Sequence, residues 1–362
     1  MTRTLRLGAA SALAAVLLAV PWINSPYQVE RFTNSIVLAL AVLGLVLLTG
    51  WSGQISLGHG ALFGVGAYST ALLVAKAGWP HPATLPVVAA VGFVCGAVAG
   101  LPALRVSGVY LALVSLALAT VFPTLVQHFA SVTGGTQGMA VPAFPSPTDG
   151  LAPDQWGYYL ALAVAVPLFW LVHNLGRSRI GAALRAGRDS EPAAIAMGVP
   201  VARQKIVAFA VSGALTATAG ALFVLVQPFP YLDSRAFTIA LSTSLVTGLV
   251  VGGARSVAGA ALAGLFLDRV PALVEDGLHL DGSATNVFYG ALLVVLVLLM
   301  PTGAVGALAA LRARLRRRTP PPVLPAPAAP GRVSLTSEGR PCTLEPQRDR
   351  GSLGGEPVQH SR

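Results

Sequence analysis

A stretch of 44 residues without a single Asp, Glu, Lys or Arg, from Phe32 to Ala75, is the strongest constraint in this sequence. A helix needs about 20 residues to cross the hydrocarbon core of a bilayer, so two spans fit back to back in this stretch. Only 10% of the whole chain is charged and 54% is hydrophobic, whereas soluble domains carry about 25% charged residues. Because helices satisfy their own backbone hydrogen bonds in lipid, the chain is predicted to be an all-α polytopic membrane protein.

Apolar runs separated by polar or Gly- and Pro-rich breaks predict about eight to ten transmembrane helices within residues 1–303. Some runs are shorter than about 20 residues, and the Gly-rich third run could be re-entrant instead of spanning. The candidate spans are Leu7–Ile23, Asn34–Gly50, Ile55–Ala75, Leu85–Leu104, Gly108–His128, Gly157–Asn174, Ile206–Gln227, Phe237–Gly252, Ser256–Pro271 and Asn286–Gly303.

The first run resembles a signal peptide, since Arg3 and Arg6 precede the apolar stretch Leu7–Val20. No small-x-small cleavage site follows it, and Trp22 and Tyr27 suit the interfacial zone beside a retained helix. We favour a retained first span.

The basic residues predict the orientation of the chain. With the N-terminus inside, ten of the Lys and Arg residues that precede Gly303 fall in inner segments and four in outer segments. Six of the ten lie in one loop, residues 175–205, which we take as cytoplasmic. Basic residues in short loops resist translocation, so both termini are predicted to lie inside.

The net charge of +10 does not indicate nucleic-acid binding, because the basic residues lie in loops and in the tail and not on a folded basic face. Residues 304–362 begin with the basic cluster Arg312–Arg318, and Pro320–Pro322 then opens a Pro-rich stretch. This composition predicts a disordered cytoplasmic tail. Its arginines are candidate contacts for anionic membrane lipid.

The sequence carries no recognisable catalytic motif. Two cysteines and six scattered histidines offer no metal-ligand spacing, and no Walker motif, nucleophile elbow or phosphate-binding loop is present. Ion-coupled carriers usually need ionisable groups in mid-membrane, and Asp268 and Arg269 are placed near the end of the ninth run. We therefore expect energy coupling through a separate ATPase, with no metal and no cofactor bound by this chain.

Three stretches stand out, and the first is Thr49–Tyr68. It holds six glycines between Gly50 and Gly66 together with polar side chains, a composition that allows a helix to break at membrane depth along a water-filled path. Close packing of helices through the glycines is the alternative. The residues predicted to line a translocation pathway are Gly53, Gln54, Ser56, His59 and Gly64.

The second stretch, Ser131–Met139, follows the fifth run and is predicted to form an outer turn through Thr133, Gly134 and Gly135. Such a turn could dock a solute-binding protein or be an ordinary connection.

The third stretch is the basic loop 175–205. Asp189 or Ser190 can cap a short helix over Glu191–Met197 that Gly198 ends. So short a helix is barely stable alone and needs a partner groove, so we predict a docking helix for a cytoplasmic motor; an amphipathic helix on the bilayer is the alternative. The candidate residues are Arg185, Arg188, Asp189, Glu191, Ala193, Ala194 and Gly198, with Ala194, Ile195 and Met197 expected on the presented face.

Together these stretches resemble the LivM-type permease family of branched-chain amino acid ABC importers. The matching segments are Gly53–His59, Gly64–Tyr68, Thr133–Thr136, Gly181–Asp189 and Val250–Gly253. The resemblance implies that residues 191–198 form a coupling helix in a groove of ATP-binding cassette ATPase subunits, which use the ATP. It further implies a second homologous permease subunit, an extracytoplasmic solute-binding protein and a place in the bacterial inner membrane.

The resemblance is incomplete at Ala119–Thr124, where family members commonly carry an acidic residue and an arginine. The family also includes permeases for urea, amides and other small solutes. Three further alternatives stay open: a sugar-type ABC importer permease, a stand-alone secondary carrier, and a membrane scaffold whose basic loop recruits a partner.

Overall fold

Helices make up nearly all of the part of the chain that the computed structural model describes, residues 3–146, 150–227, 230–278, 290 and 303–306. These residues belong to one unit, residues 1–316, and the second unit, 317–362, lies outside the described residues. The tenth candidate span, Asn286–Gly303, and the tail fall almost wholly outside as well. The predicted all-α polytopic class is confirmed.

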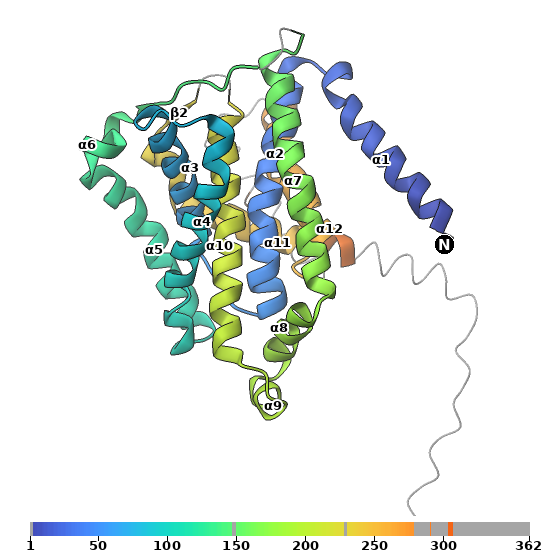
Figure 1. The fold of residues 1–362 in the computed structure, drawn as a ribbon, viewed down its shortest axis with the longest axis vertical. Coiled ribbons are helices and arrows are strands. Elements are labelled where there is room, and N and C mark those ends of the chain that lie inside the picture. Colours follow the sequence, from blue (N-terminus) through green and yellow to red (C-terminus); the bar gives the residue numbers. More distant parts are fainter. Residues whose placement is uncertain (1–2, 147–149, 228–229, 279–289, 291–302, 307–362) are drawn as a thin grey trace, which may run out of the picture. The chain divides into compact units, whose positions relative to one another are not determined.

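Two helices form the centre of the bundle (Figure 1). They are α2 (Pro26–Leu45), which the π-helical turn η1 (Val46–Trp51) continues, and α10 (Val201–Leu225). Each is 72% buried over its most apolar window. Both helices are apolar on all sides because neighbours cover them on all sides.

Three further helices are long and apolar enough to span a membrane: α4 (His81–Ala99), α5 (Val109–His128) and α7 (Pro153–Arg177). Their apolar windows are only 17–33% buried. These helices therefore present apolar side chains outwards, towards lipid or another membrane subunit.

The remaining helices differ in length. The longer ones are α1 (Arg3–Ile23), α3 (His59–Ala75), α11 (Ile239–Gly252) and α12 (Val257–Leu278), and the short ones are η2 (Pro102–Leu104), α6 (Ala130–Thr133), η3 (Gly135–Gln137), α8 (Arg179–Asp189), α9 (Glu191–Ala196) and η4 (Ser234–Phe237). Strands β1 (Met139–Ala140) and β2 (Tyr231–Leu232) pair antiparallel, with Met139 opposite Leu232. Figure 1 shows α8 and α9 at one end of the bundle, called the α9 end here, and α6 at the opposite end.

Small residues set the closest helix approaches. A Cβ on Gly66 of α3 would overlap the backbone of Ala217 on α10, and one on Gly213 of α10 would lie 2.8 Å from the Cα of Gly96 on α4. Residues without a Cβ let two backbones come this close. The sequence left close packing open as an alternative role for these glycines. The fold shows close packing at Gly66.

The first apolar run is helical, as expected. Hydrogen bonds from α7 attach the second half of α1 to the rest of the protein. Pro21 of α1 has no N–H, so it cannot bond the carbonyl of Leu17 four residues earlier. That carbonyl instead accepts the hydroxyl of Tyr158 at 2.9 Å. Tyr159 donates to the carbonyl of Leu18 at 2.9 Å in the same way.

Candidate functional site

At the α9 end of the bundle, the helix that α2 and η1 form ends among residues of several other elements. The wide π turn η1 leads to Gly50, which packs against the carbonyl of Ala254. Trp51 donates from Nε1 to the carbonyl of Arg255 at 3.4 Å, and its ring lies over Gly176. Single π turns in helices are frequent at functional sites, and this one joins α2 to the end of α7 and to the turn between α11 and α12.

A non-helical segment then follows, so α3 begins at His59 and not at Ile55 as predicted. Gly53 has a φ of 73°, which side chains disfavour. The chain folds back on η1, where the N–H of Gln54 donates to the carbonyl of Leu48 at 3.3 Å. The N–H of Leu57 donates to the hydroxyl of Ser115 at 2.9 Å. These bonds stabilise a break in the helix inside the protein, where lipid could supply no partner.

His59 links three helices through a continuous chain of hydrogen bonds. Its side chain is fully buried, with Nε2 2.7 Å from the hydroxyl of Ser212 on α10 and Nδ1 3.1 Å from the hydroxyl of Ser56. Ser212 donates its own proton to the carbonyl of Gly44 on α2 at 2.7 Å. Ser212 must therefore accept from Nε2–H, and in the neutral ring with this tautomer Nδ1 accepts from Ser56. His59 is a brace between α2, α3 and α10.

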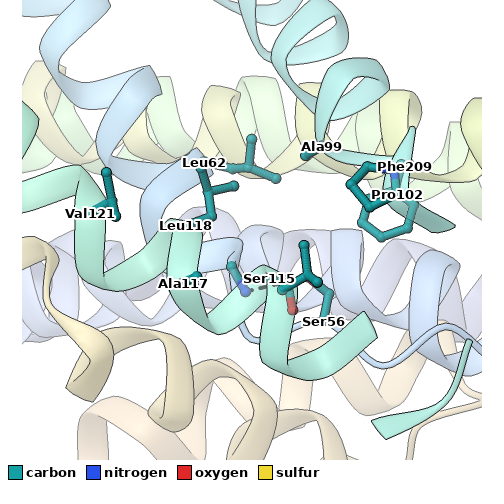
Figure 2. A pocket seen from close by; sticks show the side chains of 11 residues that line it. Ser56, Leu62, Ala99, Pro102, Ser115, Ala117, Leu118, Val121 and Phe209 are labelled. Carbon is teal, nitrogen blue, oxygen red and sulfur yellow. Dashed lines mark hydrogen bonds between the residues drawn. The ribbon is translucent and has the colours of Figure 1, made fainter. Parts of the chain in front are cut away.

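A largely apolar cavity of about 290 Å³ lies beside this break (Figure 2). Side chains from α3, α4, α5 and α10 line it, among them Leu62, Leu118, Val121 and Phe209, and Ser56 and Ser115 are its polar members. A cavity of this character can hold an aliphatic group. Of the residues predicted to line a pathway, only Ser56 contributes to it. The Cβ position of Gly64 is filled by the ring of Phe122, so Gly64 serves packing.

The basic loop folds into α8 and α9. Ser178 caps α8 and Ser190 caps α9, each accepting at 3.4 Å from the N–H three residues on, and Gly198 follows α9 with a φ of 80°. The expectation for Ala194 was wrong: it is 0% exposed, because α9 packs against α8 and α10. Ile195 and Met197 are 58% and 72% exposed, so the predicted presented face consists of these two.

Arg188 joins this loop to the helix break. Its Nη1 donates to the carbonyl of Gly50 at 2.6 Å, and its aliphatic stem covers Gly53, where a Cβ would lie 2.7 Å from its Cγ. Two groups of residues that the sequence analysis kept apart, the pathway candidates and the coupling candidates, therefore meet here.

A cavity of about 130 Å³ lies at this meeting point, between Gln54, Arg188, Glu191 and Lys205. Glu191 pairs with Lys205 at 2.9 Å. Gln54 donates to Ser52 at 2.6 Å, but its buried Oε1 has no partner in the described part of the chain. An unpaired buried acceptor costs about 1–3 kcal/mol. The charged groups that line the cavity are those of Arg188, Glu191 and Lys205.

The other coupling candidates do not reach this cavity. Arg185 donates to the carbonyl of Gly176 at 2.8 Å within its own loop. Asp189 and Ala193 are exposed.

The predicted outer turn lies at the end opposite α9. Thr133 donates to the carbonyls of Val126 and Phe129 and accepts from the N–H of Gly135. Gly134, with a φ of 81°, lies so close to the backbone of Gly138 that a Cβ would overlap it. This geometry makes an ordered cap on α5, which the β1–β2 pair fastens to the segment before α11.

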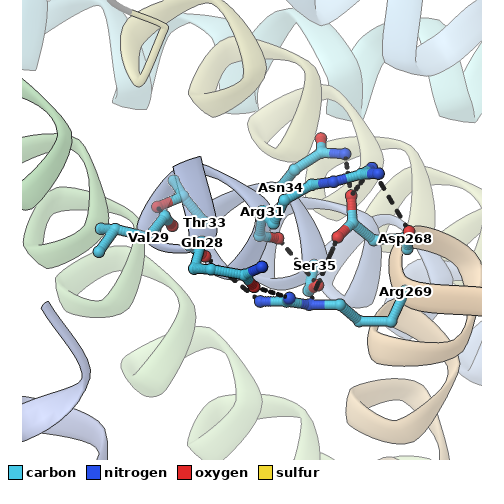
Figure 3. A network of polar contacts seen from close by, with 8 residues as sticks. All are labelled: Gln28, Val29, Arg31, Thr33, Asn34, Ser35, Asp268 and Arg269. Atoms are coloured by element: carbon cyan, nitrogen blue, oxygen red, sulfur yellow. Dashed lines mark hydrogen bonds and ion pairs between the residues drawn. The ribbon is translucent and has the colours of Figure 1, made fainter. Parts of the chain in front are cut away.

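Asp268 does not lie at the end of a helix, contrary to the sequence analysis. α12 continues through Pro271 to Leu278, and Asp268 is 3% exposed. Asn34 donates to Oδ1 at 2.7 Å and Ser35 to Oδ2 at 3.3 Å, while Arg31 and Arg269 lie 3.5 and 3.8 Å away (Figure 3). A buried carboxylate paired in this way fastens α12 to α2. Within the described residues, no group of three or more His, Cys, Asp or Glu is placed to hold a metal ion.

Comparison with known proteins supplies the deciding observation. The model of the family described as "Branched-chain amino acid transport system / permease component" matches residues 29–297, well over half of the chain. The chain belongs to this permease family. It is therefore a multi-pass membrane transport component.

Curated relatives show modest identity over most of the chain. LivM of Escherichia coli, a high-affinity branched-chain amino acid transport system permease protein, is 29% identical, covering 80% of this chain and 73% of LivM. LivH of the same organism is 26% identical, covering 77% of this chain and 96% of LivH. LsrD of Yersinia pseudotuberculosis, an autoinducer 2 import system permease protein, is 27% identical, covering 75% of this chain and 82% of LsrD. No solved structure matches significantly.

Sequence reasoning missed two residues of this permease site, Ser115 and Ser212. Both lie in apolar runs, where serines commonly bond their own helix. A signal was present for Ser212, since Ser212 and Thr216 lie four residues apart, on one face of a helix. The structure shows both to be fully buried.

Replacing Ser212 with Ala tests the His59 brace. The variant leaves a buried imidazole N–H without a partner, and we expect a loss of about 1–3 kcal/mol in stability, measured by thermal unfolding of the purified permease. Thr120→Val is the control, because Thr120 is exposed and donates only within its own helix, to the carbonyl of Ala117. Lost uptake with unchanged stability would contradict a bracing role.

Replacing Arg188 with Ala tests the link between the loop and the break. Hydrogen bonds from charged groups contribute about 1.5–3 kcal/mol, so hydrogen exchange of the amides in residues 50–56 should accelerate about tenfold or more. Arg185→Ala is the matched control, because its bond lies within the loop. Equal exchange of residues 50–56 in both variants would contradict the link.

Proposed function

We propose that this chain is the membrane-spanning permease subunit of an ATP-driven, binding-protein-dependent importer for branched-chain amino acids in the bacterial inner membrane. The names of LivM and LivH support this solute class. The name of LsrD refers to a different solute, autoinducer 2. Family membership alone therefore does not determine the solute. The apolar cavity beside Ser56 favours a solute with an aliphatic group.

The observation that carries the proposal is the α8–α9 segment at one end of the bundle. It exposes two large apolar side chains, Ile195 on a helix of six residues and Met197 at the C-cap of that helix. An apolar face on so short a helix needs a partner groove. The natural partner is a cytoplasmic ATPase, because this end carries the cluster of basic residues.

The contacts of Arg188 suggest how such a partner would drive transport. When the ATPase subunits close on ATP, α9 would move with them, and Arg188 would carry the movement to Gly50 and the break. From there His59 joins the break to α2 and α10, so the helices would shift as rigid groups. ATP would be bound by the partner, and this chain would bind no cofactor.

The other partners occupy other surfaces. A second, homologous permease subunit would cover part of the apolar surface on α4, α5 and α7, whose most apolar windows are 17–33% buried. A solute-binding protein would dock at the opposite end, where Thr133–Gly135 form an ordered turn. A stand-alone secondary carrier is less favoured, because Asp268 is already paired with Arg31 and Arg269.

Ile195→Asp and Met197→Asp test the docking role of α9. Both side chains are exposed, so the variants should fold and reach the membrane normally, while binding-protein-dependent uptake in cells should fall about tenfold or more because a charge enters an apolar groove. Leu104→Asp is the control, an exposed apolar residue of η2 at the same end. Normal uptake in both variants would contradict the proposal that α9 couples the permease to an ATPase.

A further inference from the structure

A second cavity of about 290 Å³ lies at the end of the bundle opposite α9. It is formed between the first turns of α2 and the end of α10. Its lining differs from that of the apolar cavity, because polar and apolar groups share it. The residues that matter are Glu30, Arg31, Asn34, Phe223, Val226 and Gln227.

The polar wall of this cavity carries both signs of charge. Glu30 and Arg31 lie in successive positions of α2, and both line the cavity together with the amide of Asn34. Guanidinium groups bind carboxylates through a planar fork of N–H donors, and carboxylates bind ammonium groups. The wall therefore offers one group for each charge of a zwitterion.

Buried groups hold this wall in place from behind (Figure 3). Asn34 donates to Asp268 Oδ1 at 2.7 Å, and Arg31 Nη1 lies 3.5 Å from both the same oxygen and the carbonyl of Asp268. Arg269, on the far side of Asp268, stacks over the ring of Phe32 at 3.9 Å and bonds Gln28. Side chains fixed by such contacts lose little entropy when a ligand binds.

The charges of this cluster balance. Arg31 and Arg269 both pair with Asp268, and Glu30 lines the cavity beside Arg31, so the formal charges of these four residues sum to zero. A ligand with a net charge would disturb this balance at a site partly shielded from water, whereas a neutral zwitterion would not. The cluster therefore discriminates against anionic and cationic solutes.

The opposite wall is apolar. Phe223 of α10 and Val226, the C-cap of α10, line the cavity, and the ring of Phe223 packs on that of Phe63 with centroids 5.6 Å apart. Ligand pockets start at about 300 Å³, so this cavity, at about 290 Å³, is close to the lower limit and suits a small molecule. An aliphatic side chain would fit against this wall.

We propose that this cavity is a solute site for a neutral, zwitterionic amino acid with an aliphatic side chain. Its carboxylate binds Arg31 and Asn34, its ammonium group binds Glu30, and its side chain lies against Phe223 and Val226. The assignment rests on the proposed importer function and gives the permease its own selectivity at the entrance, in addition to that of a binding protein.

The test is saturation-transfer NMR of L-leucine with the purified full-length permease complex in lipid nanodiscs, without binding protein. Wild type should show transfer to the leucine methyl groups, and leucinamide and 4-methylpentanoate, which lack one charge each, should show little. Glu30→Gln and Glu30→Arg should weaken leucine binding about tenfold or more, because an ionic hydrogen bond is lost. Glu30 is exposed, so both variants should fold.

Lys76→Gln is the matched control, since it removes an exposed charge at the same end outside the cavity. Binding that is unchanged in both Glu30 variants, or equal for leucine and leucinamide, would overturn the site. ATPase content and ATP hydrolysis are measured on the same preparation. Glu30-dependent binding without an ATPase would contradict the importer and leave the site standing, whereas coupled hydrolysis with Glu30-independent binding would contradict the site alone.

Discussion

The structure depends on the hydrogen-bond chain that runs from Ser56 through His59 and Ser212 to the carbonyl of Gly44. Lipid offers no hydrogen-bond partner, so a broken helix within a membrane protein needs polar partners inside the protein. Hydroxyl groups on α5 and α10 supply them here. The same bonds connect α2, α3 and α10. The segment at the break is therefore held in one conformation by hydrogen bonds.

The helix break lies between the α8–α9 segment and the apolar cavity. One side of it contacts the α8–α9 segment through Arg188, and the other leads into α3 and the apolar cavity beside Ser115. The far end of α2, about 30 Å away by the rise of a helix of this length, carries the charged cavity around Glu30 and Arg31. A single helix thus connects the surface that we assign to a motor with the surface that we assign to the solute.

The sequence predicted what local chemistry determines. The absence of charge from Phe32 to Ala75 indicated membrane helices, and Ser190 followed by Gly198 indicated a short helix between them. Close packing through the glycines was the alternative that the sequence left open, and it holds at Gly66. Each of these features depends on residue type and on neighbours in the chain, which are visible without a structure.

Contacts between residues far apart in the chain could not be predicted from the sequence. Arg188 and Gly50 are 138 positions apart, and His59 and Ser212 are 153 apart. Asp268 was misplaced because Pro271 looked like a helix end, although α12 continues through it. Ala194 was misplaced because its burial depends on α8 and α10, not on its own helix.

The central claim is that this permease works with a separate motor. The most direct test is to purify the tagged chain in mild detergent from its native cells and identify stoichiometric partners by mass spectrometry. The account predicts an ATP-binding cassette ATPase together with a second, similar permease. A chain that purifies alone and still moves leucine into liposomes without ATP would contradict it.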